Sequence, residues 1–133
     1  RFNELNDPKI IGIIQGIIRR LNLEAGWKPY LLMVSSHGVS PHVDNRPNPS
    51  IECSLNIPAS DLSESTIQYY AEGDTKEDYG EPQFSYCYRR PTIVRTQILH
   101  CASAGTQERY NFRVPLKGRY DEIRDQLLST FSD

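Results

Sequence analysis

The chain has 133 residues, of which 38% are hydrophobic and 24% are charged. This length suits one compact domain with one core, and the apolar fraction is too high for a disordered chain. No run of about 18 apolar residues could span a bilayer. The formal net charge of -2 provides no global positive field, so any contact with nucleic acid would have to be local. We expect residues 1–133 to form a single soluble domain without membrane or nucleic-acid partners.

The cysteines and the N-terminus bear on the cellular compartment. Cys53, Cys87 and Cys101 are an odd number with no paired spacing, which favours free thiols in a reducing cytoplasm over a disulfide framework. The chain opens with Arg1 instead of Met and has no apolar signal-peptide core, so we expect a trimmed start and not a targeting segment. These features favour a cytoplasmic protein.

Two helices are predicted, one near each end of the chain. Asp7 can cap free backbone amides and Pro8 tolerates the first helical position, and isoleucines then recur at three- and four-residue steps. This pattern predicts a helix over 7–22 with an apolar stripe that must pack on something. Apolar residues at helical spacing over Tyr120–Phe131 predict the second helix.

Between the helices, short runs typical of β-strands alternate with Pro, Asn, Gly and Ser. Seven strands without intervening helices indicate an antiparallel sandwich or barrel and not a doubly wound sheet. Two loops, 45–49 and 72–80, are long enough to carry function, although a solvated acidic run is the more common interpretation of the second. The predicted strands are Tyr30–Ser35, Val39–Asp44, Ile51–Ile57, Thr66–Ala71, Phe84–Tyr88, Thr92–His100 and Glu108–Pro115.

The triplet His42-Val43-Asp44 ends the second predicted strand. Residues two apart on a strand point to the same face, so an imidazole nitrogen and a carboxylate oxygen can converge there on one cation. This is half of a metal site. A surface histidine followed by a turn-initiating aspartate is the alternative interpretation.

A second group of polar residues follows the run Thr92–His100, in which His100 shares one strand face with three alternate residues. Residues 102–107 predict a hairpin turn, and the return strand places Arg109, Asn111 and Arg113 on one face. If that face looks inward, a guanidinium beside a metal could hold a small dianion. If it looks outward, both arginines are solvated charges. From this strand alone we favour the outward orientation.

Taken in order, these parts resemble the Fe(II)- and 2-oxoglutarate-dependent dioxygenases. Members of that family carry His-x-Asp, a distant His and a basic residue nine or ten positions later, and the resemblance covers roughly 30–115. It implies a mainly β, jelly-roll (cupin-like) double-stranded β-helix with flanking N- and C-terminal helices. It also implies that His42, Asp44 and His100 bind Fe(II) and that Arg109 binds the far carboxylate of 2-oxoglutarate, with Arg113 as the fallback.

The implied activity is hydroxylation of an unidentified substrate by dioxygen, with 2-oxoglutarate converted to succinate and carbon dioxide. Two alternatives stay open. One is a cupin-like protein that binds another divalent metal through His37, His42 and His100. The other is a jelly-roll binding module without catalysis, whose ligand platform would consist of Tyr69, Tyr70, Tyr79, Tyr86 and Tyr88.

Overall fold

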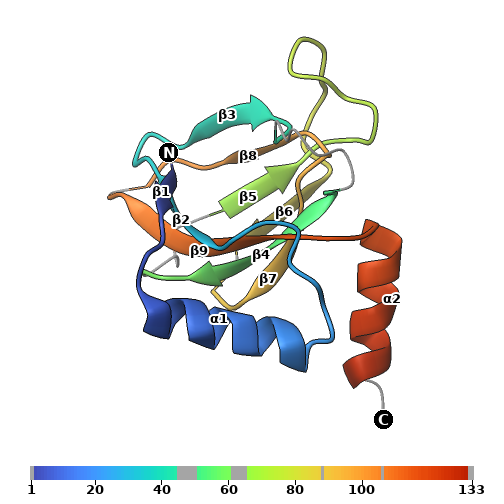
Figure 1. The fold of residues 1–133 in the computed structure, drawn as a ribbon. Coiled ribbons are helices and arrows are strands. Elements are labelled where there is room, and N and C mark those ends of the chain that lie inside the picture. Colours follow the sequence, from blue (N-terminus) through green and yellow to red (C-terminus); the bar gives the residue numbers. More distant parts are fainter. Residues whose placement is uncertain (1, 45–50, 61–65, 88, 106, 132–133) are drawn as a thin grey trace.

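In the computed structural model, the chain forms two antiparallel β-sheets and two helices (Figure 1). The structure describes residues 2–44, 51–60, 66–87, 89–105 and 107–131. The first sheet has five strands in the order β1-β2-β9-β4-β7, and the second has four in the order β3-β8-β5-β6. Their bounds are β1 Phe2–Glu4, β2 Tyr30–Val34, β3 Val39–His42, β4 Cys53–Pro58, β5 Thr66–Tyr69, β6 Phe84–Cys87, β7 Thr92–Arg95, β8 His100–Ala102 and β9 Arg109–Leu116.

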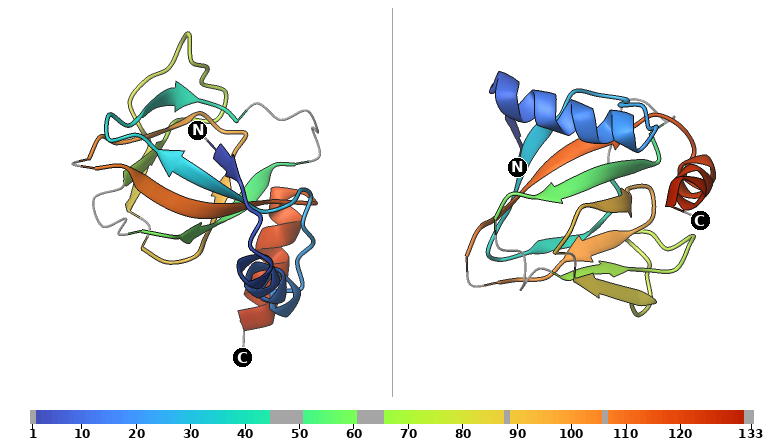
Figure 2. Two further views of the ribbon diagram at one scale, coloured as in Figure 1. Left: turned by 60° about the vertical axis from the view of Figure 1, so that its left-hand side comes forward. Right: turned by 90° about the horizontal axis from the view of Figure 1, so that it is seen from below.

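The strand pairing is nested along the chain. β5 pairs with β6, β4 with β7, β3 with β8 and β2 with β9, and all of these pairs are antiparallel. The nested pairs belong to the two sheets in alternation, so the chain resembles one long hairpin rolled across both of them. Figure 2 shows the two layers from the side. Two chain segments that are distant in sequence, 39–44 and 92–102, are therefore brought together.

Helix α1 spans Pro8–Arg20 and α2 spans Tyr120–Phe131, which agrees with both predicted helices. The side chain of Asp7 accepts a hydrogen bond from the backbone N–H of Lys9 at 2.9 Å, and Pro8 occupies the first turn. Both helices cover the outer face of the five-stranded sheet (Figures 1 and 2). Among the described residues, neither helix is both long and apolar enough to cross a membrane.

The main hydrophobic core lies between this outer face and the helices. It consists of Ile14, Ile18, Cys53, Leu55, Val114, Leu116 and Ile123, all less than 10% exposed. Successive strand residues point to opposite faces, so the alternate residues of β4 and β9 face the second sheet. Most of those inward residues are polar: Ser54, Asn56, Arg109, Asn111 and Arg113 are all buried. The outer face therefore holds the fold together, and the inner face carries the polar groups.

Three expectations from the sequence need correction. The run Thr92–His100 is not one strand, because it crosses from β7 in one sheet to β8 in the other. Consequently, 102–107 is not a hairpin turn, since β8 and β9 belong to different sheets. The favoured outward orientation of Arg109 and Arg113 is also wrong: they are 1% and 8% exposed. The reason is that the second sheet covers this polar face, as the contact of Arg113 with Asp44 shows, while the helices cover the opposite face, where Phe112 and Val114 pack against them.

Candidate metal centre

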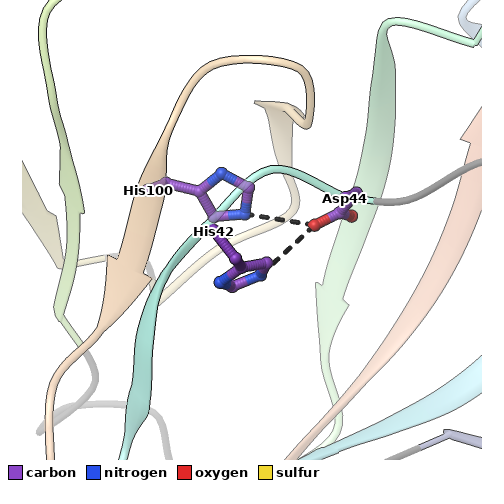
Figure 3. A group of neighbouring side chains, drawn as sticks. All are labelled: His42, Asp44 and His100. Atoms are coloured by element: carbon purple, nitrogen blue, oxygen red, sulfur yellow. Dashed lines mark ion pairs between the residues drawn. The ribbon is translucent and has the colours of Figure 1, made fainter. Parts of the chain in front are cut away.

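The structure brings together His42, Asp44 and His100 (Figure 3). His42 ends β3 and His100 begins β8, and the two are register partners on these paired strands. Their ring centroids lie 4.5 Å apart. The backbone N–H of Asp44 donates to the carbonyl of Thr96 at 2.9 Å, which fixes the aspartate beside the segment that leads into His100. The pairing of β3 with β8 and this hydrogen bond therefore bring together all three residues expected to bind a metal.

The ligand atoms of the three residues converge on a small space. Nε2 of His42 lies 3.4 Å from Asp44 Oδ1, and Nε2 of His100 lies 3.3 Å from the same oxygen. One ligand atom from each residue lies within 4.8 Å of the other two. Two imidazole nitrogens and one carboxylate oxygen on one face suit a divalent transition metal that keeps further coordination positions open.

Backbone carbonyls orient both imidazoles. Nδ1 of His42 lies 2.8 Å from the carbonyl of Ser40, and Nδ1 of His100 lies 2.7 Å from that of Ile98. A carbonyl only accepts hydrogen bonds, so each Nδ1 must carry its proton and each neutral ring offers the Nε2 lone pair. The sequence could not reveal these partners, because every residue carries the same carbonyl. Both histidines are therefore set in the tautomer that a metal requires.

Asp44 is held as a carboxylate. Burial would raise its pKa, but the hydrogen bonds that His100 and His42 donate from Nε2 when their rings are protonated, together with the positive charge of Arg113, hold the pKa of Asp44 well below its usual range. The hydrogen bond to Asp44 raises the pKa of His42 above the ordinary value, although burial opposes this shift. Asp44 therefore carries a negative charge at the position where a metal cation would bind.

Arg113 contacts the same aspartate from the inner face of the five-stranded sheet. Its Nη1 donates to Asp44 Oδ2 at 2.8 Å, and its Nε donates to Asn56 Oδ1 at 2.9 Å. Oδ2 is therefore engaged by the arginine while Oδ1 faces both histidines. From the sequence, Arg113 is only the fallback for binding the far carboxylate of 2-oxoglutarate. The spacing of Arg113 from Asp44 along the chain gave no signal of this pairing.

Arg109 occupies the same face of β9 but has a different environment. Its Nη2 donates to the carbonyls of Ser103 and Ser35 at 2.6 and 3.1 Å. Its Nε and Nη1 are buried and have no hydrogen-bond partner among the described residues. A buried guanidinium whose donors are only partly used is costly, and it suits a site that receives an anion. Of the two buried arginines on the inner face of β9, Arg109 is therefore the one that has buried donors without partners among the described residues.

A cavity of about 200 Å³ lies between the sheets and reaches the three converging residues. Buried polar atoms continue along the inner face next to it: Ser54 Oγ, Asn56 Nδ2 and Thr96 Oγ1 also lack hydrogen-bond partners within the described part of the chain. Native interiors leave few such atoms unpaired, and they commonly indicate bound water or a ligand. The cavity is lined by Leu32, Met33, Val34, Val39, His42, Asp44, Ile67, His100, Cys101, Ala102 and Arg113.

The other candidate residues are placed as follows. His37 is exposed and does not belong to the converging group, so the alternative histidine set is not assembled. Tyr69, Tyr70 and Tyr86 line one cleft, and Tyr79 packs edge-on against Tyr70 with ring centroids 5.0 Å apart. Tyr88 and the loop 45–49 lie outside the described residues.

The sequence matches no protein-family model and no curated protein. The geometry of the residues is therefore the basis for assigning a function.

Proposed function

We propose that this protein is an Fe(II)- and 2-oxoglutarate-dependent oxygenase that hydroxylates a C–H bond of its substrate. One observation carries the proposal. His42, Asp44 and His100 converge within 4.8 Å, and Arg109, on the inner face of the facing sheet, is buried with two unused donors. Arg109 shares its face of β9 with Arg113, whose Nη1 contacts Asp44. A metal site and a buried, unpaired cation on that face suit a ligand that has one end on the metal and an anionic group at the other.

The strand order supports a jelly roll for the proposed fold. Nested antiparallel pairs that alternate between two sheets, as in β2·β9, β3·β8, β4·β7 and β5·β6, are what one long rolled hairpin produces. In this arrangement the ends of β3 and β8 lie together at one end of the space between the sheets. We infer that the double-stranded β-helix implied by the sequence resemblance describes this topology.

The donor set fits Fe(II). Two neutral imidazoles and one carboxylate leave positions open for a chelating 2-oxo acid and dioxygen, and such sets are typical of non-haem iron oxygenases. Arg113 supports this choice, because it occupies Asp44 Oδ2 and leaves Oδ1 as the oxygen that faces the metal position. When bound, iron and 2-oxoglutarate would supply the oxidation of the substrate, with succinate and carbon dioxide as co-products.

The protein's own residues would bind and position the reactants. Nε2 of both histidines and Oδ1 of Asp44 would hold the metal, and the backbone carbonyls behind the imidazoles would keep them oriented. Nε and Nη1 of Arg109 would donate to the far carboxylate of 2-oxoglutarate. Leu32 and Val34 provide apolar walls of the cavity and would exclude water from this cofactor.

Anaerobic titration with Fe(II) and 2-oxoglutarate tests the proposal. A chelated 2-oxo acid on Fe(II) gives a weak visible charge-transfer band, which we expect in the native protein and not in His100→Ala. His37→Ala is the matched control, because this exposed histidine lies outside the converging group and its replacement should leave the band unchanged. A folded protein that binds Fe(II) but gives no band with 2-oxoglutarate would contradict the oxygenase assignment and favour a different metal-dependent function.

A further inference from the structure

A second, larger cleft lies beside the metal centre. It has a volume of about 400 Å³, which is within the range of sites for small molecules. Residues from the edge strands β6 and β7 line it, together with the end of β5 and the start of α2. Its lining residues are Tyr69, Tyr70, Phe84, Tyr86, Thr92, Ile93, Val94, Arg95, Ile98 and Tyr120, so Arg95 is the one charged residue among them.

A row of aromatic rings connects this cleft to a candidate metal ligand. Tyr69 is the register partner of His100 on β8, and the centroids of the two rings lie 5.8 Å apart. The Phe84 ring lies 6.5 Å from Tyr69 and 6.3 Å from Tyr86, and its plane is within 14° of the Tyr86 ring. Phe84 is 58% exposed, so this row presents apolar ring surface to a ligand.

A hydrogen-bond contact bridges the cleft at its edge strands. The hydroxyl of Tyr86 on β6 lies 3.2 Å from Oγ1 of Thr92 on β7, so the two sheets are joined where neither edge strand has a further partner in the described sheets. This contact holds the Tyr86 ring against the opposite wall. The cleft is therefore a built feature of the edge where β6 and β7 meet, and it extends round β7 to Arg95 and Tyr120 on the outer side of the five-stranded sheet.

Arg95 supplies the charge complementarity. Its guanidinium lies 4.5 Å from the centre of the Tyr120 ring, which fixes its position at the cleft. Its carboxylate neighbour is Glu72, whose Oε1 lies 4.0 Å away on a side chain that is 84% exposed. Such a long, solvated ion pair contributes little, so an anionic ligand can displace it.

We propose that the primary substrate is a small aromatic carboxylate that binds in this cleft. Its ring stacks on Phe84 and Tyr86, and its carboxylate pairs with Arg95. This inference rests on the proposed oxygenase function. In the reaction, a C–H bond of the substrate breaks and a C–O bond forms. One atom of dioxygen enters the hydroxyl group, and the other enters the succinate formed from 2-oxoglutarate as carbon dioxide leaves.

The test uses three matched probes on the metal-free protein, with dissociation constants measured by NMR titration. They are 2-naphthoate, its neutral isostere 2-naphthamide, and the non-aromatic decahydro-2-naphthoate. We expect 2-naphthoate to bind best. Arg95→Gln should weaken 2-naphthoate by about 10-fold and leave 2-naphthamide unchanged. Phe84→Ala should weaken both aromatic probes, and Arg20→Gln, at the exposed end of α1, should weaken none. Equal binding of the amide or of the decahydro acid would overturn the assignment.

A paramagnetic measurement separates this inference from the proposed function. With Mn(II) bound, the protons of 2-naphthoate should be broadened in the native protein and not in His100→Ala, because the cleft adjoins the metal centre. Tight Mn(II) binding without an Arg95-dependent naphthoate site would overturn the substrate assignment and leave the metal centre intact. Naphthoate binding in a protein that takes up no metal would overturn the metal centre, and with it the role of the cleft in oxygenation.

Discussion

Arg109→Met distinguishes an anchor for 2-oxoglutarate from an arginine that supports the fold. Methionine has a similar length without charge. The guanidinium is 1% exposed, uses Nη2 on two carbonyls and leaves Nε and Nη1 without partners among the described residues. Removing it loses two hydrogen bonds, each worth about 1.5–3 kcal/mol, but also removes a buried unpaired charge that costs several kcal/mol. We expect the free energy of unfolding of the metal-free protein to change by about 2 kcal/mol or less.

Arg113→Met is the matched control, because it removes the other buried arginine of the same strand face. Arg113 pairs with Asp44 at 2.8 Å, so its loss leaves a buried carboxylate without its cation. We expect this variant to destabilise the metal-free protein by about 3–5 kcal/mol. Urea denaturation should therefore show a clearly larger loss of stability for Arg113→Met than for Arg109→Met, although both residues lie on one strand.

Binding of 2-oxoglutarate gives the second readout. Loss of one partner of a buried charge pair costs about 2–5 kcal/mol, which corresponds to a roughly 30-fold to several-thousand-fold weaker affinity. Anaerobic calorimetry of 2-oxoglutarate with the Mn(II)-loaded protein should show this loss in Arg109→Met. Unchanged affinity in this variant would refute the assignment of Arg109 as the anchor. A loss of stability above about 4 kcal/mol would refute the view that its guanidinium is only partly paired.

Three further predictions concern the metal and the thiols. Asp44→Ala should weaken Fe(II) binding beyond the roughly 100-fold that loss of an outer hydrogen-bond partner causes, and competition with a chromogenic chelator would measure it. Metal affinity should fall as the pH is lowered, because binding needs a neutral His42 and its pKa is raised in the metal-free protein. The fall should therefore begin at a higher pH than for an ordinary histidine, and a pH-independent dissociation constant would contradict this. In the native protein, Cys87 should react rapidly with a thiol reagent, while Cys53 should react only on unfolding, since burial raises its pKa to about 11.

The local parts of the site could be predicted from the sequence. The two-residue spacing of His42 and Asp44 predicted that they converge, and they do, although β3 ends at His42 and the backbone N–H of Asp44 is held by the carbonyl of Thr96. The nine-residue spacing between His100 and Arg109 belongs to the family resemblance, and both residues are buried in the structure. That Arg109 binds 2-oxoglutarate stays a prediction. The pairing of β3 with β8, which places His100 beside His42, is a long-range contact that the sequence indicated only through its resemblance to a family.

The changes of sheet could not be predicted. Alternation in Thr92–His100 has the same period whether the run stays in one sheet or crosses to another, so it does not show where β7 ends and β8 begins. The partner of Asp44 was also hidden, because Arg113 follows it by a long stretch of chain and meets it across the two sheets. Such a pairing depends on the packing of the sheets and not on any local spacing.

The orientation of β9 shows why a strand pattern alone is ambiguous at a functional site. A strand with one polar and one apolar face normally turns its polar face to water, and that rule led to the outward orientation of Arg109 and Arg113. Here the apolar face is covered by α1 and α2, and the polar face is covered by the second sheet. Both faces are therefore buried, and the polar one carries donors without partners among the described residues. A fold selected for stability alone would fill that space with apolar side chains, so the unpaired polar atoms indicate a ligand that the inner face is built to receive.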